Sequence, residues 1–261
     1  MLEIIIAVIG SAVAGLWDLK TTEVPDEIPI LMVASGLFIW FISALSGNTY
    51  PFVLSLTIGT AVLVLGLILY KYGKWGGADA WIFAAILYLI PVYNNKTFLL
   101  DYLPNLIWVS AAFSVIYAIM LGIINRHIFK HVVRDLRENA IVVFGMPVVI
   151  AAGFLAISYT MASFAAPVKE IFLLLLAFTI FWRYAKIIET RVFTRRIPAK
   201  RLRVGDVLDS MIWRGLTPEE VKHIKRTRKF VTIKEGMRFV PVFFIALIVT
   251  LLYGNVMFWF L

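Results

Sequence analysis

Cysteine and glutamine are missing from this chain, and charged side chains make up only 16% of its 261 residues. Without cysteine, the chain has neither disulfides nor thiolate metal sites. Its three histidines are His127, His131 and His223. We expect them to be loop and surface histidines, and we expect no metal site and no cofactor.

Apolar residues make up 61% of the chain, and its mean hydropathy is +0.89. About 20 apolar residues are needed to cross roughly 30 Å of hydrocarbon as a helix. Eight stretches approach that length, although the fourth is short for a full crossing: 2–17, 28–46, 51–70, 79–93, 105–125, 139–160, 168–185 and 238–260. We therefore predict an all-α polytopic membrane protein with six to eight transmembrane helices.

The net charge of +9 is distributed unevenly between the two sides of the membrane. If the spans alternate in direction, every Lys and Arg except Lys96 and Lys169 falls on one side. Such an excess marks the cytoplasmic side. We expect a multi-pass protein of the cell (plasma) membrane with its N-terminus outside, and basic groups that meet anionic lipid headgroups rather than nucleic acid.

The basic groups concentrate in the one sizeable soluble segment, residues 183–237. Gly205-Asp206 predicts a turn between short extended pieces, and Thr217-Pro218-Glu219-Glu220 predicts a capped helix to about Lys229. The expected organisation is a transmembrane catalytic helical domain over 1–182, a small basic cytoplasmic α+β module over 183–237 and a C-terminal transmembrane helix over 238–261.

Two aspartates stand at the margins of apolar spans on the predicted cytoplasmic side. Asp18 follows the first span and Asp79 opens the fourth. A carboxylate at the edge of hydrocarbon is costly, which suggests a function. Two such groups can hydrolyse a peptide if one is ionised and one protonated. Structural roles remain open, since Asp79 could be an N-cap and Asp18 a flanking charge.

The element Gly76-Gly77-Ala78-Asp79, preceded by Asp18 and a proline-bearing loop, resembles the GxGD membrane aspartyl proteases. Within that group it is most similar to the archaeal preflagellin (prearchaellin) peptidases and the type IV prepilin peptidases. The stretches 197–208 and 233–241 also resemble the C-terminal part of some archaeal members. The resemblance implies that Asp18 and Asp79 are catalytic. It also implies cleavage of a short basic leader from archaellin or pilin precursors at the cytoplasmic face.

Three features depart from the family pattern. Ala78 replaces the second glycine of strict GxGD, and Trp81 stands where many bacterial members have lysine. The cysteine-bearing segment of bifunctional bacterial members is missing, so the N-methylation associated with it is not expected.

Two further groups of residues suit a basic, extended substrate. The acidic loop, formed by Glu23, Asp26 and Glu27, would attract a cationic leader, although these acids could instead only solvate the loop. Gly76 and Gly77 would leave room beside Asp79 for an extended peptide.

Two other functions compete with this hypothesis. A transporter or channel could use membrane carboxylates as proton or cation relays, but it favours ionisable groups near the midplane and inverted repeats. A presenilin-like intramembrane protease would carry a Pro-Ala-Leu element in a late span. The nearest string here, Pro198-Ala199-Lys200, lies in the soluble segment.

Overall fold

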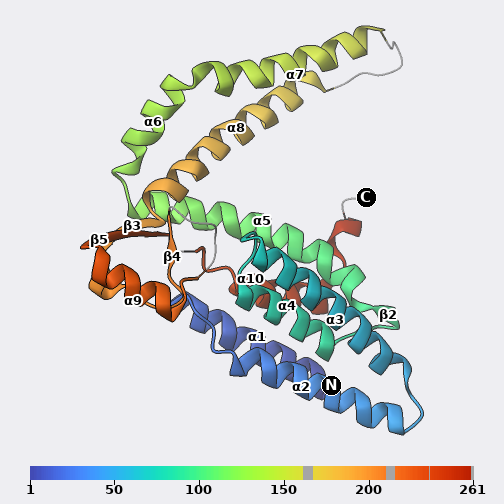
Figure 1. Ribbon diagram of the computed structural model, residues 1–261. Coiled ribbons are helices and arrows are strands. Elements are labelled where there is room, and N and C mark those ends of the chain that lie inside the picture. Colours follow the sequence, from blue (N-terminus) through green and yellow to red (C-terminus); the bar gives the residue numbers. More distant parts are fainter. Residues whose placement is uncertain (161–166, 210–214, 235, 260–261) are drawn as a thin grey trace. The chain divides into compact units, whose positions relative to one another are not determined.

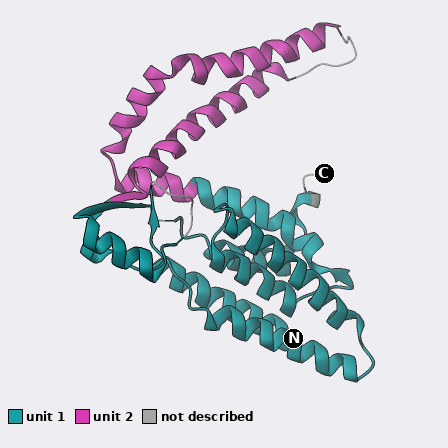
Figure 2. Cartoon of the chain, in the orientation of Figure 1, with its two compact units in different colours: residues 1–115, 196–261 teal, residues 116–195 magenta. Residues whose placement is uncertain are grey.

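The computed structural model describes residues 1–160, 167–209, 215–234 and 236–259 (Figure 1). Residue 260 of the eighth predicted span and parts of the predicted module therefore lie outside the described residues. The chain forms two compact units, residues 1–115 with 196–261 and residues 116–195 (Figure 2). The predicted functional division at residues 182 and 237 stays a prediction.

The elements are, in chain order, α1 (Leu2–Thr21), α2 (Glu27–Leu45), α3 (Tyr50–Lys71), α4 (Gly77–Leu89), β1 (Val92–Tyr93), β2 (Lys96–Thr97), α5 (Phe98–Ile124), α6 (Ile128–Glu138), α7 (Ala140–Thr160), α8 (Val168–Arg191), β3 (Thr194–Pro198), η1 (Ala199–Arg201), β4 (Val207–Leu208), α9 (Pro218–Thr227), β5 (Phe230–Lys234), α10 (Pro241–Tyr253) and η2 (Val256–Trp259).

Six of these helices, α1, α2, α3, α5, α7 and α8, are long and apolar enough to cross a membrane, while α4 and α10 are shorter apolar helices. The prediction of an all-α polytopic membrane protein with six to eight transmembrane helices is confirmed. At about 1.5 Å per residue, the 13 residues of α4 reach only about 20 Å. The ends of α4 therefore need partners within the protein.

Helix α4 is the centre of the first unit, because nearly all of its side chains from Asp79 to Leu89 are buried. It packs against α1, α2 and α3. Phe83 on α4 contacts Tyr102 of α5 and stacks on Phe243 of α10 at 6.0 Å between ring centroids. An all-round apolar helix is expected in such a buried place.

The last carbonyl groups of α4 are paired by side chains of its neighbours. Ser55 of α3 donates to the Tyr88 carbonyl at 2.7 Å, and Trp40 of α2 donates to the Leu89 carbonyl at 3.0 Å. Gly36 permits the approach of α2, since a Cβ there would lie 2.7 Å from the Tyr88 oxygen. These bonds satisfy orphan carbonyls that would be costly without water.

Helix α10 is held at its end by a buried asparagine of α5. The Asn105 amide donates to the Thr250 hydroxyl at 2.9 Å and to the Gly254 carbonyl at 2.6 Å. Its oxygen accepts from the Val256 amide at 3.0 Å. Tyr102 adds a bond from its hydroxyl to the Phe243 carbonyl at 2.9 Å. Both ends of α10 are thereby placed, which matters for the site at its start.

The soluble part of the first unit is a small α+β module with its own core. Its three-stranded sheet has the order β3-β5-β4, with β4 and β5 antiparallel. The predicted capped helix is confirmed as α9, where the Thr217 hydroxyl accepts from the Glu220 amide and the Glu220 carboxylate accepts from the Thr217 amide. The apolar core contains Ala199, Leu202, Leu208, Leu216, Val221, Ile224, Val231 and Ile233.

The second unit contains α6, a helix where the sequence predicts only a loop over 126–138. Ile128 and Val132 lie one helical turn apart on α6 and are buried against Ile187 and Ile188 of α8. Ile128, Val132 and Leu136 recur every four residues among charged ones, an amphipathic pattern that a search for long apolar runs does not detect.

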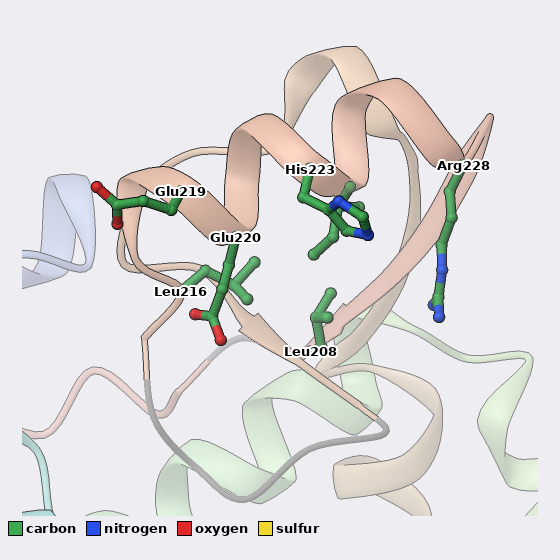
Figure 3. Close-up of a pocket in the computed structure, with 7 residues that line it drawn as sticks. Leu208, Leu216, Glu219, Glu220, His223 and Arg228 are labelled. Carbon is green, nitrogen blue, oxygen red and sulfur yellow. The ribbon is translucent and has the colours of Figure 1, made fainter.

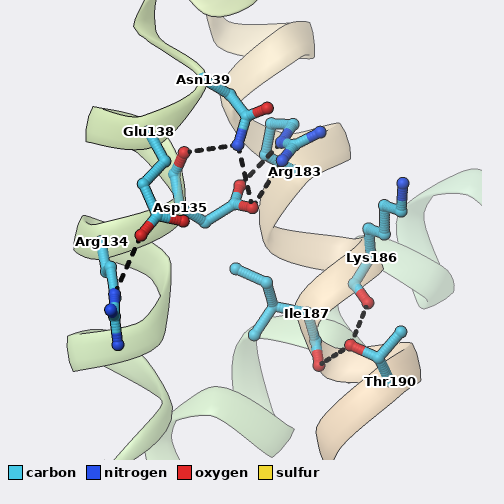
Figure 4. A network of polar contacts seen from close by, with 8 residues as sticks. All are labelled: Arg134, Asp135, Glu138, Asn139, Arg183, Lys186, Ile187 and Thr190. Atoms are coloured by element: carbon cyan, nitrogen blue, oxygen red, sulfur yellow. Dashed lines mark hydrogen bonds and ion pairs between the residues drawn. The ribbon is translucent and has the colours of Figure 1, made fainter.

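A polar network ties α6 to α8 in this unit (Figure 4). The Arg183 guanidinium donates to both oxygens of Asp135, at 2.7 and 2.5 Å. Asn139 donates to the same carboxylate at 3.3 Å. Planar, two-pronged pairing of this kind fixes geometry as well as charge. Asp135 and Arg183 are thus structural groups of the second unit.

Candidate functional site

Asp18 lies in the last turn of α1, because the helix continues four residues past the predicted end of the first span. Its side chain is buried, with 6% of the residue exposed. One carboxylate oxygen, Oδ2, accepts a hydrogen bond from the Val240 amide at 3.1 Å. A buried carboxylate so close to the membrane is paired rather than solvated.

Asp79 lies in the first turn of α4, at the third helical position rather than before the helix. It is 9% exposed, and its Oδ2 accepts from the Gly76 amide at 3.1 Å. This bond caps the start of the helix, whose dipole also favours a negative charge. The alternative prediction, that Asp79 has the structural role of a helix cap, is therefore correct in part. Asp79 caps α4, and it also faces a cavity.

The fold brings the two predicted aspartates to one place. Helix α1 packs against α4, and the Asp18 and Asp79 carboxyl groups interact electrostatically. Two like charges held close together in a poorly hydrated place resist simultaneous ionisation. Acid/base hydrolysis of a peptide requires a pair in which one carboxyl group is ionised and one protonated.

A cavity of about 430 Å³ opens beside Asp79. Its walls come from the loop before α4 and from the segment before α10. The lining residues are Gly73, Lys74, Trp75, Gly76, Asp79, Gly236, Met237 and Phe239. Three glycines keep side chains out of this space, so a peptide backbone could approach the Asp79 carboxyl group.

Gly76 and Gly77 differ in their surroundings, although the sequence groups them together. A Cβ on Gly76 would stand 2.6 Å from Oδ2 of Asp79, closer than real Cβ contacts. A Cβ on Gly77 would meet only the Tyr70 ring, at 3.5 Å, which is ordinary contact. Gly76 also lines the cavity, whereas Gly77 does not. The steric requirement beside Asp79 therefore falls on Gly76.

The acidic loop lies in the connection between α1 and α2. Glu23, Asp26 and Glu27 are all exposed, and none of them lines the cavity beside Asp79. Exposed carboxylates act on a charged ligand through the surrounding solvent rather than by fixed contact. If these acids act on a substrate, they attract it before it reaches the aspartates.

Sequence reasoning missed the segment Gly236–Val240 as part of the site. The Val240 amide reaches Asp18, and the Arg238 side chain interacts electrostatically with the same carboxyl group. The only sequence signal for this segment is the resemblance of 233–241 to the C-terminal part of archaeal relatives.

A second cavity, of about 490 Å³, lies in the soluble module (Figure 3). Leu208, Leu216 and Ile224 give it an apolar floor. The carboxylates at its edge belong to Glu219 and Glu220 in the first turn of α9. The Glu220 carboxylate accepts from the Thr217 amide at 2.9 Å and so caps the start of α9.

Comparison with known proteins finds a match for the part of the chain that carries both aspartates, slightly less than half of its length. Residues 5–125 match the model of the type IV leader peptidase family. No curated protein and no solved structure matches the chain.

Proposed function

We propose that this protein, whose residues 5–125 belong to the type IV leader peptidase family of membrane proteases, is a two-aspartate endopeptidase. Its proposed substrates are archaellin or type IV pilin-like precursors. It removes their short basic leader at the cytoplasmic face of the membrane, with Asp18 and Asp79 as the catalytic pair. One observation carries the proposal: two buried carboxyl groups from different helices interact electrostatically, and one of them, Asp79, lines a cavity.

The chemistry needs no group beyond these residues and water. The ionised carboxylate takes a proton from water as the water oxygen attacks the scissile carbonyl carbon. The protonated carboxyl gives its proton to the carbonyl oxygen, which leaves a neutral tetrahedral diol. When the carbon–nitrogen bond breaks, one carboxyl group protonates the departing amine and the other, ionised, takes a proton from a hydroxyl of the diol as that oxygen becomes the carbonyl oxygen of the product. The pair then again holds one shared proton.

The cavity suits a substrate that becomes extended before it is cut. A helical peptide hides its carbonyl groups in its own hydrogen bonds, so water can attack only after local unwinding. Gly73, Gly76 and Gly236 line the cavity without side chains. An extended stretch of about three residues spans roughly 10 Å, which suits a space of about 430 Å³.

The cytoplasmic orientation rests on the distribution of charge. Lys20, Lys71 and Lys74 lie near the ends of α1 and α3, on the same side as the two aspartates. The module adds exposed basic residues at Lys200, Arg201, Arg203, Lys222, Lys225, Arg226, Arg228 and Lys229. Basic groups gather on the cytoplasmic side of membrane proteins, where they also attract anionic headgroups.

Neutralising the acidic loop is expected to raise KM for precursors with basic leaders several-fold at low salt and to leave kcat nearly unchanged. The reason is that Glu23, Asp26 and Glu27 are exposed charges outside the cavity, so they concentrate substrate without touching the scissile bond. The triple Glu23→Gln, Asp26→Asn, Glu27→Gln variant is compared with wild type from low to high salt. An equal KM at low salt would contradict a role for the acidic loop.

The function itself is tested with purified protein in detergent or liposomes. Full-length archaellin and type IV pilin precursors are each incubated with it, and the masses of both products are measured. We expect one cut, just before the hydrophobic helix of the precursor, that yields an intact leader. Absence of cleavage of both precursors would refute the proposed function, and cuts within the hydrophobic helix would favour a presenilin-like protease.

A further inference from the structure

The segment Gly236–Val240 lies against both aspartates at once. Gly236, Met237 and Phe239 share a cavity with Asp79, and the Val240 amide donates to Asp18 at 3.1 Å. The segment follows β5 of the soluble module and leads directly into α10. It therefore joins the module to the aspartate pair.

The start of α10 is built against α1. A Cβ on Gly15 would lie 3.1 Å from Cα of Pro241, tighter than most real Cβ contacts, so glycine at this position favours the close approach of the two backbones. Asp18 lies three residues after Gly15, on the same face of α1. Close packing at Gly15 thus brings the Asp18 carboxylate to the first residues of α10.

Val240 is the residue before α10 and is almost fully buried, with 2% exposed. The amides of Val242 and Phe243 are occupied by the Phe239 and Val240 carbonyls, and Pro241 has no amide proton. The Val240 amide is thus the donor that the helix start presents to Asp18. The positive end of the α10 dipole lies behind it.

A cation completes the surroundings of this carboxylate. Burial of Asp18 favours its neutral form, and two groups oppose this effect: the Val240 amide and the half-buried Arg238 side chain, two residues before Val240. Asp79 likewise has one amide donor, from Gly76, at the start of α4, and the charged group that acts on it is the Asp18 carboxyl group rather than a cation. Arg238 is therefore the group that distinguishes the surroundings of the two carboxyl groups. A nearby cation and an amide donor both favour the charged form of a carboxyl group.

We propose that Val240 and Arg238 are positioning residues that hold Asp18 as the ionised base of the pair and leave Asp79 as the proton donor. The inference rests on the proposed function for its catalytic consequence. It makes the segment Gly236–Val240 a third part of the site, beyond the family match, which ends at residue 125.

The amide of Val240 is removed by Val240→Pro and kept by Val240→Ala. Val240 has φ −54°, a value that proline adopts, so the substitution removes the donor with little demand on the angle itself. We expect kcat for precursor cleavage to fall about tenfold or more in Val240→Pro, with KM changed little. Val240→Ala loses buried side-chain packing but retains most of kcat.

The charge of Arg238 is removed by Arg238→Met and kept by Arg238→Lys. We expect Arg238→Met to lower kcat by about tenfold at unchanged KM, and Arg238→Lys to restore most of the activity. Equal kcat values in wild type, Val240→Pro and Arg238→Met, with the precursor cleaved normally, would overturn the proposal and leave the proposed function standing.

A measurement that needs no substrate tests the roles of Val240 and Arg238 separately from the proposed function. Carbodiimide reacts with protonated carboxyl groups, and the modified aspartate is found by peptide mass spectrometry of the purified protein. We expect Asp79 to be labelled before Asp18 in wild type, and Asp18 labelling to rise several-fold in Val240→Pro and Arg238→Met but not in Val240→Ala or Arg238→Lys. Labelling of Asp18 first in wild type, or unchanged labelling in the variants, would overturn the proposal even if no precursor is cleaved.

Discussion

Asparagine in place of either Asp18 or Asp79 lowers the rate of precursor cleavage by about a thousandfold, in our expectation. Each substitution keeps the size of the side chain but removes its ability to carry a proton. The remaining carboxylate can then neither share a proton with its partner nor protonate the departing amine. Single-turnover cleavage of a pilin or archaellin precursor by purified Asp18→Asn and Asp79→Asn variants provides the measurement.

Asp101→Asn is the matched control for this pair. Asp101 lies in the first turn of α5, beyond the end of α4 that is opposite to Asp79. Its substitution is expected to leave the rate within about twofold of wild type, because a surface substitution away from the site changes little. Wild-type rates in Asp18→Asn or Asp79→Asn would show that the assignment of the pair is wrong.

Alanine at Gly76 is expected to lower the rate of cleavage by about a hundredfold, since a misplacement of about 1 Å in a reacting group has this effect. The added Cβ would stand 2.6 Å from Oδ2 of Asp79. The carboxyl group must rotate away and lose its bond to the Gly76 amide. Backbone strain is excluded as the cause, because Gly76 has φ −76° and ψ 147°, which alanine adopts readily.

Gly77→Ala is the control, one residue further along the chain at the first position of α4. Its Cβ would meet the Tyr70 ring at 3.5 Å, an ordinary contact, so near wild-type cleavage is expected. Both variants are compared for kcat and KM and for thermal unfolding in detergent. If Gly76→Ala and Gly77→Ala lose activity equally, flexibility of the loop, and not the space beside Asp79, determines the rate.

Most of the membrane architecture could be predicted from the sequence, because burial in lipid requires long apolar runs whatever their packing. The sequence-based predictions are wrong where packing between helices determines the secondary structure. The stretch 126–138 contains α6 because Ile128 and Val132 bury against α8. Helix α1 extends through Asp18 to Thr21, where Thr22 ends it with φ 63°. A search for long apolar runs misses α6, whose apolar residues alternate with charged ones at helical spacing, and the extension of α1 past Trp17 has no clear signal in hydropathy.

The site could be predicted only in part, for a related reason. Asp18 and Asp79 are visible because charge at the edge of hydrocarbon is rare. The donor to Asp18 is a backbone amide 222 residues later in the chain, and backbone groups leave no trace in the sequence. Likewise, the different surroundings of Gly76 and Gly77 depend on side-chain positions that neighbouring letters do not specify.

The meeting of Asp18 and Asp79 in one site is the central claim, and a cross-link tests it most directly. The chain has no cysteine, so Asp18→Cys/Asp79→Cys carries the only two thiols, and Asp18→Cys/Asp101→Cys is its control. A short bifunctional thiol reagent is applied to the folded protein in liposomes, and linked peptides are identified by mass spectrometry. We predict an intramolecular link between positions 18 and 79 and none between 18 and 101. Single adducts at both cysteines of Asp18→Cys/Asp79→Cys, with no link between them, would contradict the claim.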